Sequence, residues 1–110
     1  MEQDALLTRL EELERACVDV DERLHALRRA AQAIRVELES GRPLSEIVAT
    51  GPGPRARRDV RESWSALNRK LHEYRVAMVK RLVDGEGMTI ADAARITGNA
   101  RQVISRLYHG

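Results

Sequence analysis

The first forty residues carry an apolar heptad repeat, and this repeat constrains the fold more than any other feature of the chain. Apolar side chains recur at alternating steps of four and three residues over about five heptads, and three or four heptads already indicate a coiled coil. The repeat consists of Leu6, Leu10, Leu13, Cys17, Val20, Leu24, Leu27, Ala31, Ile34 and Leu38. A helix on the order of 50 Å long cannot bury such a stripe by itself, so the pattern predicts a partner helix.

Glycine and proline mark the end of this helix and the loop that follows. Neither residue interrupts the repeat, and Gly41 and Pro43 then stop the helix. We expect a loop at about residues 41–59, because the sequence GPGP at 51–54 disfavours regular structure. Residues 44–50 can form one or two helical turns within this loop.

A second long helix is predicted from Asp59 to about Asp84. Asp59 and Glu62 resemble a capping pair at its start. Its apolar side chains form two rows: the first consists of Val60, Trp64, Leu67, Leu71, Tyr74 and Met78, and the second of Val76, Val79 and Val83. We expect the first row to face the N-terminal helix and the second row to support the C-terminal segment.

The composition fits an all-α protein. The chain has no Phe, 33% of its residues are charged, and Leu, Ala, Arg and Glu are abundant, which is typical of long helices. No apolar run is long enough to span a membrane, and a single cysteine excludes an intrachain disulfide. We therefore expect a cytoplasmic protein.

Charge is divided unevenly along the chain. Residues 1–40 contain six basic and ten acidic side chains, whereas residues 41–110 contain thirteen basic and seven acidic ones. This division suggests that the acidic part faces protein and that the basic part faces an anion.

The C-terminal residues have the pattern of two short helices joined by a turn. Thr89, with Asp92 three residues later, can cap the first helix. Ala94 is small where the two helices approach, and Gly98 suits a turn with positive φ. Asn99 can alternatively cap the second helix, which spans about Ala100 to Tyr108. The inward-facing positions are Ile90, Ala93, Ile104 and Leu107.

This segment resembles the helix-turn-helix of bacterial repressors, resolvases and transposases over roughly the last fifth of the chain. The resemblance implies that residues 85–110 bind double-stranded DNA, with the second helix in the major groove. We expect Arg101 and Gln102 to contact base edges, because Arg pairs with guanine and Gln with adenine. Four further residues complete the predicted DNA-binding set: Thr89, Asn99, Ser105 and Arg106. Of these, Ser105 and Arg106 are expected to contact bases or phosphates.

Three more arginines are candidate phosphate contacts. Arg55, Arg57 and Arg58 precede the predicted second long helix, where the helix dipole disfavours cations, so their presence hints at a bound anion. A solvated basic loop is the alternative. The three histidines are widely separated, and no Cys or carboxylate joins them at metal-ligand spacing. No catalytic arrangement emerges either, so we expect no metal, no cofactor and no enzymatic activity.

Residues 1–84 are predicted to form a coiled-coil helical hairpin that dimerises through the heptad stripe. All residues of the stripe except Ala31 are expected to contribute to the dimer contact. The e positions of the heptad run from acidic Glu14 and Asp21 to basic Arg28 and Arg35, which favours antiparallel pairing. The partner helix comes either from a second chain or from the chain's own second long helix. A dimer of hairpins, close to a four-helix bundle, satisfies all the stripes.

The sequence therefore predicts a small dimeric DNA-binding protein, acting as a nucleoid-associated bacterial transcriptional regulator. An alternative is a coiled-coil adaptor, antitoxin-like or bound to the transcription machinery, without sequence-specific DNA binding. A third alternative is a small helical enzyme of the chorismate-mutase type, but its Arg/Lys/Glu active-site set cannot be placed on this sequence.

Overall fold

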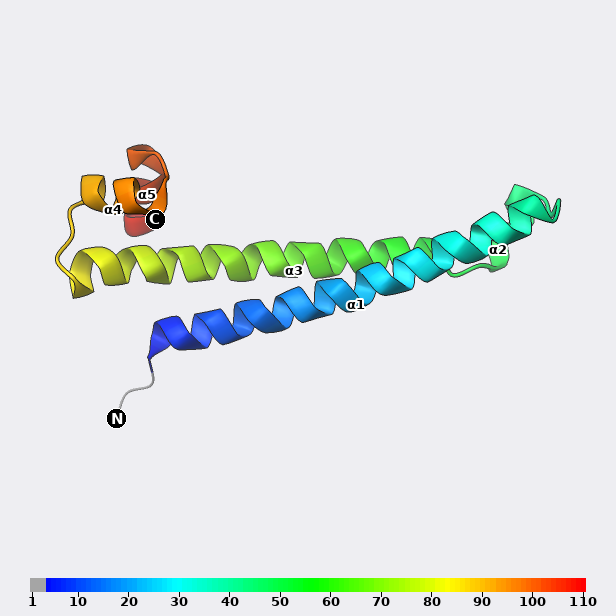
Figure 1. The fold of residues 1–110 in the computed structure, drawn as a ribbon, viewed down its shortest axis with the longest axis horizontal. Coiled ribbons are helices and arrows are strands. Elements are labelled where there is room, and N and C mark those ends of the chain that lie inside the picture. The colour runs from blue at the N-terminus through cyan, green and yellow to red at the C-terminus, as the bar shows by residue number, and fades with distance from the viewer. Residues whose placement is uncertain (1–3) are drawn as a thin grey trace. The chain divides into compact units, whose positions relative to one another are not determined.

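The computed structural model describes residues 4–110, and all regular structure in this range is helical, which confirms the predicted all-α class. In chain order the helices are α1 (Ala5–Glu39), α2 (Leu44–Thr50), α3 (Gly53–Lys80), the π-helical turn η1 (Arg81–Gly85), α4 (Ile90–Thr97) and α5 (Arg101–His109) (Figure 1). The described residues form two compact units. Residues 14–68 make the central unit, and residues 4–13 with 69–110 make the C-terminal unit.

In the central unit α1 runs antiparallel to α3. Arg23 Nη1 lies 3.7 Å from a carboxylate oxygen of Asp59. Further along α1, Ile34 lies close to Gly53, the first residue of α3. A Cβ added at Gly53 would be 3.0 Å from the Cδ1 atom of Ile34. The buried residues of the unit are mostly small: Val20, Ala30, Ile47, Gly53, Ala56 and Ser63. These small side chains let the two helices approach closely.

α3 begins at Gly53, six residues before the predicted start at Asp59, and this prediction is corrected. Pro54 lies in the first helical turn, where its fixed φ suits the helix and its missing N–H has no intrahelical acceptor. Asp59 lies inside the helix, where its backbone carbonyl accepts a hydrogen bond of 2.9 Å from the Ser63 hydroxyl. The loop predicted at about 41–59 is therefore reduced to two short connections, one before and one after α2. The short helix predicted at residues 44–50 is present as α2.

The first apolar row of α3 does not face α1 as a whole, and that prediction is wrong for Trp64. Trp64 is 52% exposed, and the adjacent Ser63 takes the buried position against α1. A single partner helix covers only part of a wide apolar stripe, and a small residue permits a closer approach than an indole does. Among the predicted dimerisation residues, Val20 is buried, Leu6, Leu10, Leu13, Leu27 and Ile34 are half-buried, and Cys17, Leu24 and Leu38 are exposed.

In the C-terminal unit the start of α1 runs antiparallel to the end of α3 and to η1. Three ion pairs follow this direction: Asp4 with Arg81 at 2.6 Å, Arg9 with Glu73 at 3.2 Å, and Glu12 with Lys70 at 3.3 Å. Leu71, from the first apolar row of α3, is exposed here. The helix continues through η1 to Gly85, close to the predicted end at Asp84.

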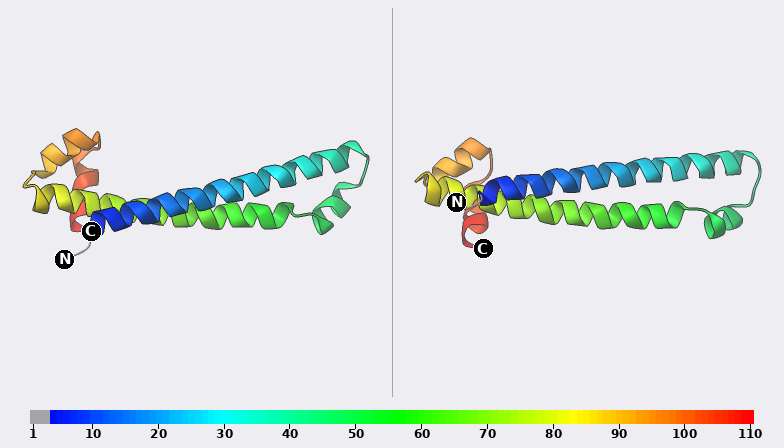
Figure 2. Two further views of the ribbon diagram at one scale, coloured as in Figure 1. Left: turned by 60° about the horizontal axis from the view of Figure 1, so that its bottom comes forward. Right: turned by 90° about the horizontal axis from the view of Figure 1, so that it is seen from below.

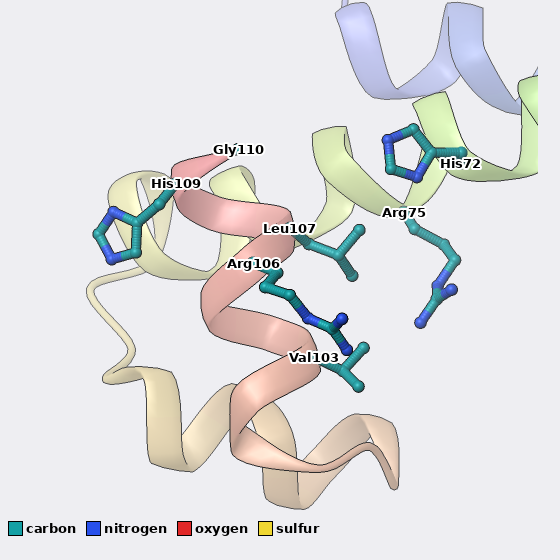
Figure 3. Close-up of a pocket in the computed structure, with 7 residues that line it drawn as sticks. All are labelled: His72, Arg75, Val103, Arg106, Leu107, His109 and Gly110. Atoms are coloured by element: carbon teal, nitrogen blue, oxygen red, sulfur yellow. The ribbon is translucent and has the colours of Figure 1, made fainter.

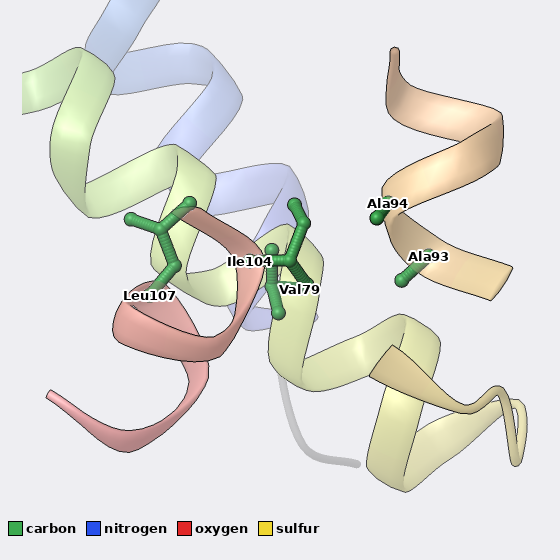
Figure 4. Packing of buried hydrophobic residues seen from close by; sticks show 5 residues of the cluster. All are labelled: Val79, Ala93, Ala94, Ile104 and Leu107. Carbon is green, nitrogen blue, oxygen red and sulfur yellow. The ribbon is translucent and has the colours of Figure 1, made fainter. Parts of the chain in front are cut away.

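α4 and α5 pack against the end of α3 (Figure 2). Their shared core consists of Val79, Ala93, Ala94, Ile104 and Leu107, all buried (Figure 4). The other two members of the second apolar row, Val76 and Val83, are partly buried against this core. The prediction that this row supports the C-terminal segment is therefore confirmed. No helix within residues 4–110 is long and apolar enough to cross a membrane.

Candidate nucleic-acid interface

α4 has well-formed ends at both positions that the sequence singled out. The Thr89 Oγ1 accepts a hydrogen bond of 3.1 Å from the backbone N–H of Asp92 and so satisfies a free amide of the first turn. Gly98 ends the helix with φ of 71° and ψ of 20°, in the left-handed region that only Gly adopts at low cost. Both features fix the length of α4 and the direction in which the chain leaves it.

Asn99 does not cap α5, and the alternative that it does so is wrong. The capping position is held by Ala100, whose side chain offers no acceptor. The Asn99 backbone N–H instead donates to the Ala94 carbonyl at 3.1 Å, and its side-chain amide donates to the Thr97 carbonyl at 3.3 Å. Asn99 is therefore tied to the end of α4, and α5 begins with Arg101.

α5 has one buried and one polar face. Ile104 and Leu107 are buried against α3 and α4, with Val103 and Tyr108 partly buried beside them. The opposite face carries two adjacent rows of side chains spaced four residues apart, Arg101, Ser105 and His109 in one row and Gln102 and Arg106 in the other. All of them are exposed except Ser105, which is half-buried. The structure thus brings together four of the predicted DNA-contacting residues on one helical face.

A hydrogen bond between side chains holds the end of α5 against η1. The Tyr108 hydroxyl donates to the Asp84 carboxylate at 2.5 Å. This bond, together with partial desolvation, raises the pKa of Tyr108 above its ordinary value. Because the bond joins α5 to the turn that follows α3, it limits rotation of α5 about its own axis.

A groove beside α5 adds basic residues that the sequence analysis missed. His72 and Arg75 of α3 line it together with Val103, Arg106 and Leu107 of α5. In Figure 3 the Arg75 and Arg106 side chains extend to the same side of the groove, and His109 projects from the other side of α5. The sequence offers one indication that Arg75 lies near α5. Arg75 precedes Val79, the centre of the supporting apolar row, by one helical turn. Arg75 therefore extends the basic surface from α5 onto α3.

α4 presents a different kind of surface. Arg95 pairs with Asp92 at 3.2 Å, so its charge is partly compensated within the helix. Ile96 is 55% exposed on the same helix. Thr89 is also exposed, although its hydroxyl oxygen is already engaged as the cap.

The three predicted phosphate contacts outside the C-terminal segment lie in the central unit. Arg55, Arg57 and Arg58 are exposed in the first turns of α3, not in a loop before it. Arg55 lines a groove with Ala30, Ala56 and other residues of the same unit. These arginines therefore belong to a different unit from the polar face of α5.

The C-terminal unit thus presents a polar, basic face on α5 beside Arg75 of α3. Comparison of the chain with protein-family models, with curated proteins and with solved structures found no match.

Proposed function

We propose that this chain binds double-stranded DNA with α4 and α5 acting as a helix-turn-helix and α5 lying in the major groove. The observation that supports this most is the polar face of α5, on which Arg101, Gln102 and Arg106 are exposed opposite the buried Ile104 and Leu107. A helix of this width fits the major groove of B-DNA, and bidentate Arg and Gln side chains distinguish base edges there. Arg101 and Gln102, in the first turn of α5, contact bases.

Flanking basic residues supply contacts to the DNA backbone. Arg75 and Arg106 line the groove beside α5, and their side chains extend to the same side of it (Figure 3), where they act on phosphates. Phosphate contacts fix the orientation of a recognition helix without reading sequence. The protein acts as a bacterial transcriptional regulator, and a homodimer formed through the long helices presents two copies of α5 to two half-sites.

Selection of bound duplexes from a random DNA pool tests sequence recognition. The wild-type protein should enrich a defined motif, and Arg101→Ala should lose the preference at one position. Its affinity for the best site should fall roughly 5- to 150-fold, which corresponds to about 1–3 kcal/mol. Arg15→Ala, an exposed arginine of α1, is the matched control and should leave the motif unchanged. A selection without enrichment contradicts the assignment of α5 as a recognition helix.

An adaptor that binds another protein is the second candidate, because Ile96 exposes apolar surface on α4. Salt dependence separates the two functions. DNA affinity should fall steeply as salt rises, with Arg75→Ala and Arg106→Ala each reducing the slope of log affinity against log salt by about one. Binding of a protein through Ile96 should change little with salt, and the uncharged variant Ile96→Ser should abolish it without adding a charge that repels phosphates.

A further inference from the structure

In the central unit the apolar face of α1 is covered by α3 on one side only. Val20 is buried in the contact, and Asp19 lines a groove along one edge of it. Around the helix axis, Leu24 lies about 40° from Val20, because it follows four residues later. Asp19, one residue before Val20, lies about 100° away in the opposite direction. Leu24 and Asp19 therefore flank Val20 on opposite sides, and Leu24 is 41% exposed.

α3 leaves its apolar surface uncovered on the same side. Ser63 is buried against α1, Glu62 lines the groove with Asp19, and Trp64 follows Ser63 on the opposite flank. The contact of Arg23 with Asp59 sets the register, so that Trp64, five residues after Asp59, lies level with Val18, five residues before Arg23. The result is an open strip, made of Cys17, Leu24, Ala31 and Leu38 of α1 and Trp64 of α3, all exposed.

The charges that border this strip on α1 complement a second, inverted copy of themselves. Glu14, Asp21, Arg28 and Arg35 are all exposed and recur every seven residues, in the order acidic, acidic, basic, basic. When two such rows run antiparallel, Asp21 meets Arg28 of the second copy and Glu14 meets Arg35 of the second copy. The apolar row pairs in nearly the same register, offset by one residue or about 1.5 Å along the helix axis, so that Leu24 lies next to Leu24 and Cys17 lies next to Ala31 of the second copy.

We propose that a second copy of this chain packs on the open strip, with the two α1 helices antiparallel and Leu24 next to the two-fold axis. The inference specifies the dimer of the proposed function but rests on the central unit alone. Arg57 and Arg61 lie beside Trp64 on α3. Like charges would meet if α3 faced its own copy, so the close contact is made by α1. Such isologous contacts are the commonest way in which soluble proteins form dimers.

Thiol crosslinking in the absence of DNA tests the register directly. In the proposed dimer the two Cys17 residues are separated by about 14 residues of helix, or about 21 Å, so a short thiol crosslinker should not join them. Ala31→Cys in the native background should give efficient crosslinks between Cys17 of one copy and the introduced thiol of the other. Cys17→Ser with Leu24→Cys should crosslink at the two-fold axis. Efficient crosslinking through Cys17 alone indicates a parallel dimer and overturns the proposal.

Charge reversal tests the same register without cysteines. Asp21→Arg and Arg28→Asp, made separately, each place like charges at two symmetric contacts and should weaken the dimer by roughly tenfold. The double variant restores opposite charges in the antiparallel register and should recover the wild-type dimer affinity. Additive weakening in the double variant contradicts the pairing of Asp21 with Arg28 of the second copy.

Disruption of the strip tests its role as the interface. Leu24→Asp should convert the dimer to a monomer and shift the fluorescence of the single tryptophan, Trp64, towards that of a solvated indole. Val18→Asp is the matched control, because Val18 is 57% exposed outside the strip, and it should leave the dimer intact. Circular dichroism checks that each variant stays helical, and if Leu24→Asp loses helix, the crosslinking and charge-reversal results decide. A wild-type protein that is monomeric at high concentration by light scattering overturns the proposal.

Discussion

Gly98 determines where α4 stops and how the chain turns into α5. Its φ of 71° lies in the left-handed region, and a Cβ at this position would meet nothing within 4 Å. The cost of Gly98→Ala is therefore conformational, not steric, and we expect a loss of about 1–2 kcal/mol in unfolding free energy. Chemical denaturation measures it. Gly85→Ala is the control, because Gly85 has no positive φ, and a similar loss in both variants contradicts this account.

Tyr108 is expected to titrate late because its hydroxyl donates to Asp84. Its pKa is raised above the ordinary value of 10.0, first by the hydrogen bond to Asp84 and then by desolvation. The stabilisation from this bond is therefore present below about pH 10 and is lost as pH rises through the raised pKa. The tyrosine signal that disappears in Tyr108→Phe should titrate above 10.0 in ultraviolet absorbance, and Asp84→Asn should return it towards that value. An ordinary titration in the wild-type protein argues against the bond.

At the scale of elements, carboxylates hold the start of α1 against the end of α3 and η1. The hydrogen bond from Arg81 lowers the pKa of Asp4 below 3.8, and those from Arg9 and Lys70 lower the pKa of Glu12 below 4.5. Groups with lowered pKa values stabilise the fold above their ordinary values and lose this effect as pH falls through the lowered ones.

We therefore expect the first turns of α1 to detach during acidification, between about pH 5 and pH 2. Amide hydrogen exchange followed by NMR should show faster exchange in residues 5–13 over this range. Asp4→Asn and Glu12→Gln should show part of that faster exchange already at neutral pH. Protection that does not depend on pH in the wild-type protein contradicts a role for these ion pairs.

The sequence was sufficient to predict the helices, apart from the start of α3, but not which sides of them meet. The heptad repeat predicted α1, and the second apolar row of α3 predicted that α3 supports α4 and α5. Both predictions succeeded because the spacing of apolar residues shows which side of a helix is buried. A stripe wide enough for two neighbours does not reveal which neighbour takes which side, so the burial of Ser63 beside an exposed Trp64 was missed. Pro54 was interpreted as a helix breaker because the same residue favours the first turn of a helix and disfavours its interior.

The candidate site was partly predictable for a similar reason. The cap at Thr89 and the turn at Gly98 depend on local backbone chemistry, which neighbouring residues specify. The polar face of α5 followed from its apolar face. Arg75 was not predicted, because its position beside Arg106 depends on how α5 docks on α3. Its position one turn before Val79 indicates that it lies near the supporting apolar row, but not which residue of α5 it meets.

For the whole molecule, the dimer and the DNA contact should be thermodynamically linked. The proposed dimer would hold two recognition helices, so the second half-site would be bound at high effective concentration once the first is occupied. Leu24→Asp should weaken binding to a two-half-site duplex by roughly 100-fold, yet leave affinity for a single half-site nearly unchanged. Titrations with both duplexes, with Val18→Asp as control, measure this difference. Equal losses on both duplexes would show that Leu24 affects the DNA-binding surface itself.

The burial of Val79 has a consequence for whether α4 and α5 can be transferred to another protein. α4 and α5 contribute Ala93, Ala94, Ile104 and Leu107 to their core, and α3 supplies the remaining buried side chain. Two short helices with so little apolar surface of their own are marginal as an isolated peptide in water. A fragment of residues 86–110 should be largely unstructured, and a chimera that takes up α4 and α5 has to carry the last turns of α3 as well. The smallest part of this chain that can be transferred with its packing intact is therefore α4 and α5 together with the end of α3.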